Sequence, residues 1–175
     1  EVIATDYSAA MVAALEQRVR DAGVANVRCE RADLYALRFD AGTFDAVVAA
    51  NVLHLVPDLP GALAALRRVV RPGGRIVVPT FCHDETGLSW VVSRALAVTG
   101  FPGHRRFTSK SLRQAVEDAG VRVTRAEVLP GVIPLTLNIA LPESLSEMTT
   151  VPASNELLEF EVVALNAARV CPTTA

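Results

Sequence analysis

The fold is decided by residues 2–8, which read Val-Ile-Ala-Thr-Asp-Tyr-Ser. The first part of this stretch is a short apolar run, which is the pattern of a strand buried in a parallel sheet. Asp6 follows the run directly, and Ser8 is a residue type that caps the amino end of a helix. The stretch therefore predicts a strand, a turn that carries a carboxylate, and a helix.

This pattern of a strand followed by a helix recurs along the first 120 residues. Further strands are predicted over residues 27–31, 44–50 and 75–80, with helices near Pro60 and after Thr108 or Ser109. Short connections between alternating strands and helices produce a parallel sheet with helices on both faces. The last two predicted strands, 121–128 and 132–141, have no helix between them and should pair antiparallel at the edge. The predicted fold is α/β, doubly wound and Rossmann-like.

A change of composition after Pro142 sets the predicted domain boundary. Residues 1–142 are predicted to form one domain, and residues 143–175 a polar tail with a helix over 156–169. The chain opens on Glu1 directly before the apolar run, which we interpret as a cut through a longer domain.

Composition and charge exclude several classes of function. Hydrophobic residues make up 51% of the 175 and charged residues 21%, which is typical of a globular protein. The net charge of −2 gives no general attraction to nucleic acid or anionic lipid. No apolar run reaches the roughly 18 residues that a membrane span requires. The three cysteines are far apart, which indicates neither disulfides nor a zinc site and fits a reducing cytoplasm.

Candidate binding residues follow the predicted strands, because ligands of open α/β sheets bind at the carboxyl ends of the strands. Asp6 can accept two hydrogen bonds from a ribose diol, and capping of the helix at Ser8 is the alternative role. Asp33 follows the next strand. Its carboxylate and the backbone N–H of Leu34 match the N6 amino group and N1 of adenine, and an Asx-type turn is the alternative.

Two further candidates follow the third predicted strand. Asn51 ends this strand, where it would meet the polar end of a cofactor or close the turn. His54 lies three residues further on and is a candidate base or orienting donor toward the substrate. A histidine packed beneath the loop is the commoner outcome.

Four blocks of the sequence, in this order, resemble class I S-adenosylmethionine-dependent methyltransferases. Residues 2–11 resemble the family's second conserved block, 32–34 its adenine-binding block, 43–48 its central fourth strand, and 70–78 the turn into its fifth strand. The resemblance covers residues 1–141 and is closest to the small-molecule branch that includes ubiquinone and menaquinone biosynthesis enzymes.

The resemblance implies S-adenosylmethionine as the cofactor and a small, hydrophobic acceptor. The residues that it assigns to cofactor binding are Asp6, Tyr7, Asp33, Leu34 and Asn51. It further implies that Trp90, within a predicted helix over residues 87–97, belongs to a segment that covers the acceptor, and ordinary packing of this segment onto the sheet is the alternative.

The sequence departs from the family in one important respect. The family's first strand and its glycine-rich loop should precede the ribose-binding acid, but only five residues precede Asp6. We therefore expect the chain to bind the cofactor poorly, and we expect unpaired strand edges that invite self-association.

Two alternatives remain open. A nicotinamide-dependent oxidoreductase would use Asp6 in the same way, although Asp33-Leu34 and the antiparallel closing pair favour the methyltransferase. A non-catalytic, methyltransferase-like partner subunit is the other alternative.

The residues after the third predicted strand count against a nucleic-acid substrate. Family members that methylate nucleic-acid amino groups carry an Asp/Asn-Pro-Pro-aromatic block at this place, whereas residues 51–54 here read Asn-Val-Leu-His.

Overall fold

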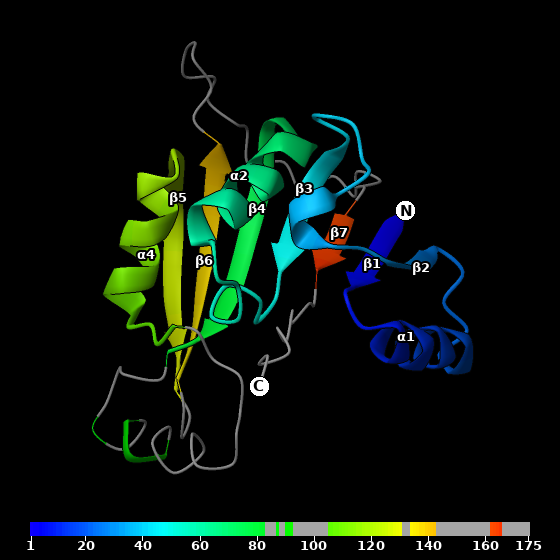
Figure 1. Ribbon diagram of the computed structural model, residues 1–175, viewed down its shortest axis with the longest axis horizontal. Helices are drawn as coiled ribbons and strands as arrows, with labels where there is room; N and C mark the ends of the chain where they lie inside the picture. Colours follow the sequence, from blue (N-terminus) through cyan, green and yellow to red (C-terminus); the bar gives the residue numbers. More distant parts are fainter. Residues whose placement is uncertain (83–86, 88–89, 93–104, 131–133, 143–161, 166–175) are drawn as a thin grey trace, which may run out of the picture.

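One mixed sheet organises the computed structural model of the chain (Figure 1). The structure describes residues 1–82, 87, 90–92, 105–130, 134–142 and 162–165. The strands are β1 (Val2–Asp6), β2 (Val27–Arg31), β3 (Phe44–Ala49), β4 (Val70–Phe81), β5 (Val121–Leu129), β6 (Leu135–Pro142) and β7 (Val162–Leu165). The helices are α1 (Ala9–Asp21), the short 3₁₀ helix η1 (Leu34–Ala36), α2 (Leu59–Val69) and α4 (Ser109–Asp118).

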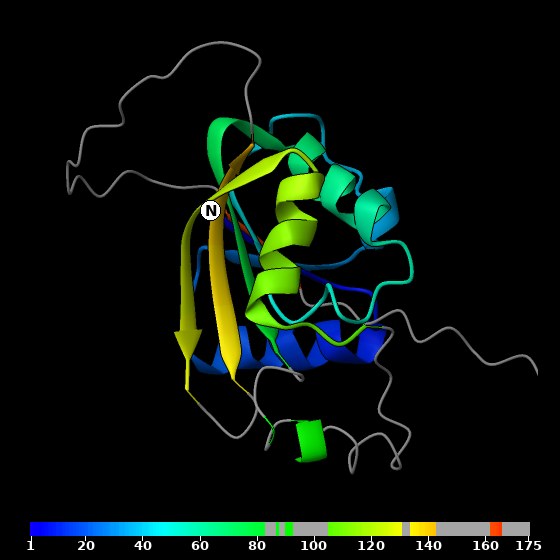
Figure 2. The ribbon, with the colours of Figure 1, turned by 90° about the vertical axis from the view of Figure 1, so that its left-hand side faces the viewer.

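The strand order is β2-β1-β7-β3-β4-β6-β5, and it confirms the predicted fold class. Within this sheet, β1, β2, β3, β4 and β7 pair in parallel, whereas β6 is antiparallel to both β4 and β5. Helices α2 and α4 lie on the same face of the sheet, and α1 packs beside β1 and β2 at the opposite end (Figures 1 and 2). The predicted antiparallel closing pair is therefore present.

Each of the helices α1, α2 and α4 begins at a polar cap residue. Ser8 accepts a hydrogen bond from the N–H of Met11, Asp58 from that of Gly61, and Thr108 from that of Ser111. These side chains satisfy N–H groups that have no partner within the helix. The caps at Ser8 and Thr108 agree with the sequence prediction. The cap at Ser8 lies two residues after the end of β1 and thereby sets the start of α1.

Helix α2 supplies much of the core beneath this edge. Pro60 stands in its first turn, where a missing N–H costs nothing. Apolar side chains of α2 pack into the same buried cluster as apolar side chains of β3 and β4. The members of this cluster include Leu63, Leu66 and Val69 from the helix and Val47, Ile76 and Val78 from the strands. This core holds the carboxyl ends of β3 and β4 in a fixed position.

The entry into β4 depends on Gly74. The strand already begins at Val70, so that Pro72-Gly73-Gly74 lies within it rather than between a helix and a later strand. A Cβ atom on Gly74 would lie 2.7 Å from the backbone oxygen of Asp45 and 2.6 Å from Val70 Cγ1. Only glycine allows β3 and β4 to approach this closely.

The C-terminal part of the chain corrects two expectations. Residues 162–165, inside the predicted helix 156–169, form strand β7 instead. This strand lies between β1 and β3 and pairs in parallel with both, from Val2↔Val162 to Thr5↔Leu165 on one side and from Ala46↔Val162 to Ala49↔Leu165 on the other. The edges of β1 and β3 that we expected to be open are therefore paired. The other residues of the predicted tail helix lie outside the described part of the chain.

The predicted helix over residues 87–97 lies only partly within the described residues. Residues 87 and 90–92 are helical, and the remainder is outside the described part.

Candidate functional site

The carboxyl ends of β1 and β2 are joined directly to each other. The N–H of Ala32 donates to the carbonyl of Asp6 at 3.1 Å, and Arg31 Nε donates to the carbonyl of Tyr7 at 2.9 Å. The Arg31 guanidinium also lies 5.3 Å from the centre of the Tyr7 ring, within the range of a cation–π contact. The residues after the two strands, which carry Asp6 and Asp33, therefore lie side by side.

Asp6 is the last residue of β1, directly before the turn into α1, and it is only 6% exposed. Its Oδ1 accepts a 2.7 Å hydrogen bond from the N–H of Ser8, so the carboxylate does support the turn into α1. Burial raises the pKa of Asp6, and the bond from Ser8 offsets part of that rise. Its second oxygen has no hydrogen-bond partner among the described residues, so one acceptor remains for a ligand.

Asp33 lies just outside the end of β2 and caps η1. Its Oδ1 accepts a 2.9 Å hydrogen bond from the N–H of Tyr35, which is the Asx-type turn that was the alternative. The other carboxylate oxygen has no hydrogen-bond partner among the described residues. Leu34 is the first residue of η1, a position at which the N–H lies outside the helical hydrogen bonds. An acceptor and a donor therefore stand on adjacent residues, as adenine requires.

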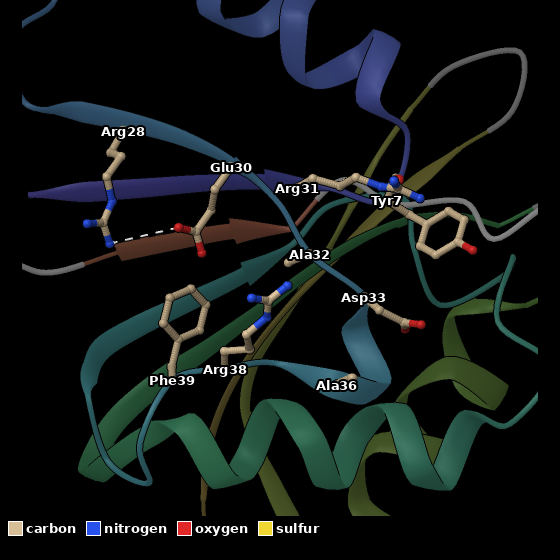
Figure 3. A pocket seen from close by; sticks show the side chains of 9 residues that line it. All are labelled: Tyr7, Arg28, Glu30, Arg31, Ala32, Asp33, Ala36, Arg38 and Phe39. Atoms are coloured by element: carbon tan, nitrogen blue, oxygen red, sulfur yellow. Dashed lines mark hydrogen bonds and ion pairs between the residues drawn. The ribbon is translucent and has the colours of Figure 1, made fainter.

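A cavity of about 700 Å³ runs along β2 and ends at these residues (Figure 3). The side chains that line it come from three segments: the strand end of β1, strand β2 and the stretch through η1 (Tyr7, Arg28, Glu30, Arg31, Ala32, Asp33, Ala36, Arg38 and Phe39). The sequence prediction identified Tyr7 and Asp33 but missed Arg38 and Phe39. No motif marks those two residues, because only the fold brings residues 36–39 over the edge strand.

Asn51 lies directly after β3, in a strained backbone conformation. Its φ of 53° is the only positive value among the described residues other than glycine. Its N–H donates to the carbonyl of Pro79 in β4 at 2.8 Å, whereas its Oδ1 is buried without a partner in the structure. Thr80 Oγ1, on the next residue of β4, is also buried without a partner. Two unsatisfied polar atoms thus gather at the neighbouring ends of β3 and β4.

His54 and Trp90 lie in different environments. His54 is 3% exposed, in the buried loop between β3 and α2, and its carbonyl accepts the N–H of Arg105 at 3.1 Å. This burial agrees with the packed alternative. Trp90 is 50% exposed.

Comparison with known proteins shows which family the first part of the chain resembles. A family model described as a methyltransferase domain matches residues 1–78. The chain is also 39% identical over 82 residues to the ubiquinone/menaquinone biosynthesis C-methyltransferase of Idiomarina loihiensis. Residues 1–78 therefore resemble the methyltransferase domain family. The matched residues contain Asp6, Asp33, Asn51 and His54, and the resemblance in the sequence is confirmed.

The curated relatives are considerably longer than this chain. The match to the Idiomarina protein covers 46% of this chain and 33% of that protein. A demethylmenaquinone methyltransferase of Bacillus subtilis is 38% identical over 77 residues, which cover 44% of this chain and 33% of the relative. The aligned part of the chain thus spans about a third of the length of these relatives.

Solved structures support the fold. An S-adenosylmethionine-dependent methyltransferase from Aquifex aeolicus superposes with a TM-score of 0.64 and 21% identity, covering 81% of this chain and 69% of that one. One from Methanosarcina mazei gives a TM-score of 0.65 and 17% identity, covering 80% and 81%. At these identities the comparison establishes a shared architecture. Together with the family match, it leaves the nicotinamide-dependent alternative without support.

Among the described residues, no group of three or more histidine, cysteine or acidic side chains is arranged to hold a metal ion. Within the same part of the chain, every helix is too short or too polar to cross a membrane.

Proposed function

We propose that the chain transfers a methyl group from S-adenosylmethionine to a small, hydrophobic acceptor. The observation that carries this proposal is the pair of adjacent strand ends that present Asp6 and Asp33, linked by the Ala32 N–H to Asp6 carbonyl bond. Asp6 on one strand end can accept hydrogen bonds from a ribose. Asp33 and the N–H of Leu34, beyond the next strand end, can bind adenine, so that the two strand ends together match the two halves of adenosine. The match of residues 1–78 to the methyltransferase domain family supports this interpretation.

The residues present fit the cofactor chemically. Each of the two aspartates spends one oxygen on its own turn and keeps the other for a ligand. The buried Oδ1 of Asn51, which has no partner, offers an acceptor for the ammonium of the methionine part. Bound S-adenosylmethionine supplies an activated methyl group on a sulfonium.

The chain's own residues then mainly have to orient the two reactants and exclude water. Asp6 and Asp33 fix the adenosine, and the core under β3 and β4 holds Asn51 at a constant distance from them. His54 is buried in the loop that follows Asn51, where it would support the loop and orient the acceptor. No strong base is required for transfer from a sulfonium.

The acceptor class is proposed from the apolar character of the segment around Trp90 and from the relatives. Several matched relatives are named for ubiquinone and menaquinone biosynthesis, and a hydrophobic, quinone-type acceptor would extend that pattern to this chain. If Trp90 covers the acceptor, Trp90→Ala should raise the Michaelis constant for a naphthoquinol acceptor and leave cofactor affinity unchanged. Its 50% exposure makes an unfolded variant improbable on packing grounds, so unaltered acceptor kinetics would remove Trp90 from the site.

The test of the proposed function is a calorimetric titration of the 175-residue chain with S-adenosylmethionine, S-adenosylhomocysteine and NAD⁺. Because β7 pairs with the edges of β1 and β3 that the sequence left open, we expect saturable binding of the first two ligands, in place of the poor binding expected from the sequence, and none of the third. Methyl transfer to a naphthoquinol, followed by mass spectrometry, tests the reaction itself. Binding without any transfer would favour the non-catalytic partner subunit, and failure of both adenosyl ligands to bind would refute the proposal for this chain.

A further inference from the structure

The cavity beside Asp33 extends well beyond the space that an adenine would need. It continues from Asp33 along β2 as far as Arg28 and has a volume of about 700 Å³. Figure 3 shows Tyr7 and Asp33 at one end, Arg28 and Phe39 at the other, and the guanidinium of Arg38 between them. An adenine held by Asp33 would therefore have open space next to its N6 edge.

The arginines that line this cavity differ in whether they form hydrogen bonds or ion pairs with other residues. Arg31 donates to the carbonyl of Tyr7, and Arg28 lies 4.0 Å from Glu30. Arg38 lines the cavity but forms no ion pair or hydrogen bond within the described part of the chain. In Figure 3 its guanidinium is directed across the cavity toward Ala32. Arg38 is therefore the cation that is available to a ligand.

Protection of an edge strand explains only part of this arrangement. Charged side chains on edge strands prevent unwanted pairing with other sheets, and this accounts for Arg28 and Glu30 on β2. Arg38 belongs to the segment after η1, and its side chain faces the cavity rather than the open side of the strand. Its position next to Phe39 gives an apolar wall and a cation, which suits a short chain that ends in an anion.

We propose that this extension of the cavity is an anion subsite, which admits adenosyl ligands carrying a short anionic substituent on N6. This inference rests on the proposed function, because it takes Asp33 as the residue that reads adenine. A substituted N6 still carries one hydrogen for the Asp33 carboxylate. The methylene groups of the substituent lie against Phe39, and its terminal carboxylate pairs with Arg38.

The experiment compares three forms of S-adenosylhomocysteine by calorimetry on the full 175-residue chain: unmodified, N6-butyl and N6-(3-carboxypropyl). The carboxypropyl form should bind about 2- to 5-fold more tightly than the butyl form, the range for an ion pair at a solvent-accessible site. The advantage should shrink as salt is raised from low to physiological ionic strength, because exposed charges are screened. The butyl form controls for the length and the apolar contact of the substituent.

Variants assign the effect to one side chain. Arg38→Ala should remove the difference between the carboxypropyl and butyl forms while leaving unmodified S-adenosylhomocysteine unaffected. Arg113→Ala is the matched control, since Arg113 is an exposed arginine on α4 that is paired with Glu117 and does not line the cavity. This control should preserve the difference.

The outcomes separate this inference from the proposed function. If unmodified S-adenosylhomocysteine does not bind, the cofactor assignment and the subsite both fail. If it binds, but the carboxypropyl form binds no better than the butyl form, the subsite alone is refuted. An advantage that survives Arg38→Ala would also refute it, because the anion would then be held elsewhere.

Discussion

Replacement of Asp6 separates its two roles, in the turn and in ligand binding. Asp6 accepts the N–H of Ser8 through Oδ1 and has one oxygen left for a ribose hydroxyl. Asp6→Asn keeps an acceptor for Ser8 and carries no charge. Asp6→Ala removes both functions. A comparison of the two variants therefore distinguishes damage to the turn from loss of a ligand contact.

The expected magnitude follows from the contacts. A hydrogen bond to a charged group contributes about 1.5–3 kcal/mol, so Asp6→Ala should weaken S-adenosylmethionine binding by roughly 10- to 150-fold. The unliganded protein should change little in melting temperature. The lost bond from Ser8 to the carboxylate costs about 1.5–3 kcal/mol, but this loss is offset because the substitution also removes the cost of burying the carboxylate.

The effect of pH provides a second measurement on the same residue. Burial raises the pKa of Asp6 in the folded protein above its unfolded value, so the folded state binds the proton more readily than the unfolded state does. The free-energy cost of burying the charged Asp6 carboxylate is fully present above the pKa of the folded state. This cost disappears as the pH falls below the pKa of the unfolded state. Relative to Asp6→Asn, the wild type should thus gain stability as the pH falls through this window.

The assays are calorimetric titration with S-adenosylmethionine and thermal unfolding between neutral and acidic pH. Asp6→Asn should bind more weakly than the wild type while α1 remains intact by circular dichroism. Unaltered affinity in both variants would exclude Asp6 from the site. A stability difference that does not vary with pH would contradict the stated effect of burial on its pKa.

Three further predictions follow from the site and the sheet. Asp33→Ala should weaken cofactor binding by about 1.5–3 kcal/mol yet spare turnover at saturating cofactor, since adenine lies away from the methyl group; a large fall in that turnover rate would contradict the assignment. Gly74→Ala should lower the free energy of unfolding by about 1–3 kcal/mol, because the new Cβ would lie 2.7 Å from the Asp45 oxygen, whereas Gly87→Ala, with no atom within 4 Å, should be nearly neutral in the same denaturant titration. Ala164→Pro, which removes an N–H from a strand paired on both sides, should destabilise the chain by about 3 kcal/mol or more and abolish cofactor binding; native-like stability would mean that β7 is dispensable.

Much of the fold was predictable because its signals are local. The apolar run before Asp6, the cap at Ser8 and the cap at Thr108 each depend on a few neighbouring residues, and the structure contains all three features. Strand β7 was not predictable in this way. Residues 162–165 read Val-Val-Ala-Leu, a short apolar run that fits a helix as well as a buried strand. Only its partners β1 and β3, more than 100 residues earlier in the chain, decide between the two.

The candidate site shows the same division between local and distant signals. Asp6 and Asp33 were identified because each directly follows a strand, and the structure joins those strand ends. Their hydrogen bonds to Ser8 and Tyr35 also show that the turn and the ligand need not compete, since a carboxylate has two oxygens. Arg38 and Phe39 had no such signal, because their place in the cavity depends on how η1 folds back over β2.

Strand β7 connects the fold to the proposed chemistry. Its last residue, Leu165, is in register with Thr5 on one side and Ala49 on the other. Asp6 and Asn51 follow those two partners by one and two residues, so β7 ends at the centre of the edge where the cofactor is proposed to bind. The spacing between the ribose side of the site, on β1, and the methionine side, after β3, is set by the backbone of β7. A strand without any proposed ligand contact thereby determines whether Asp6 and Asn51 can hold the same molecule.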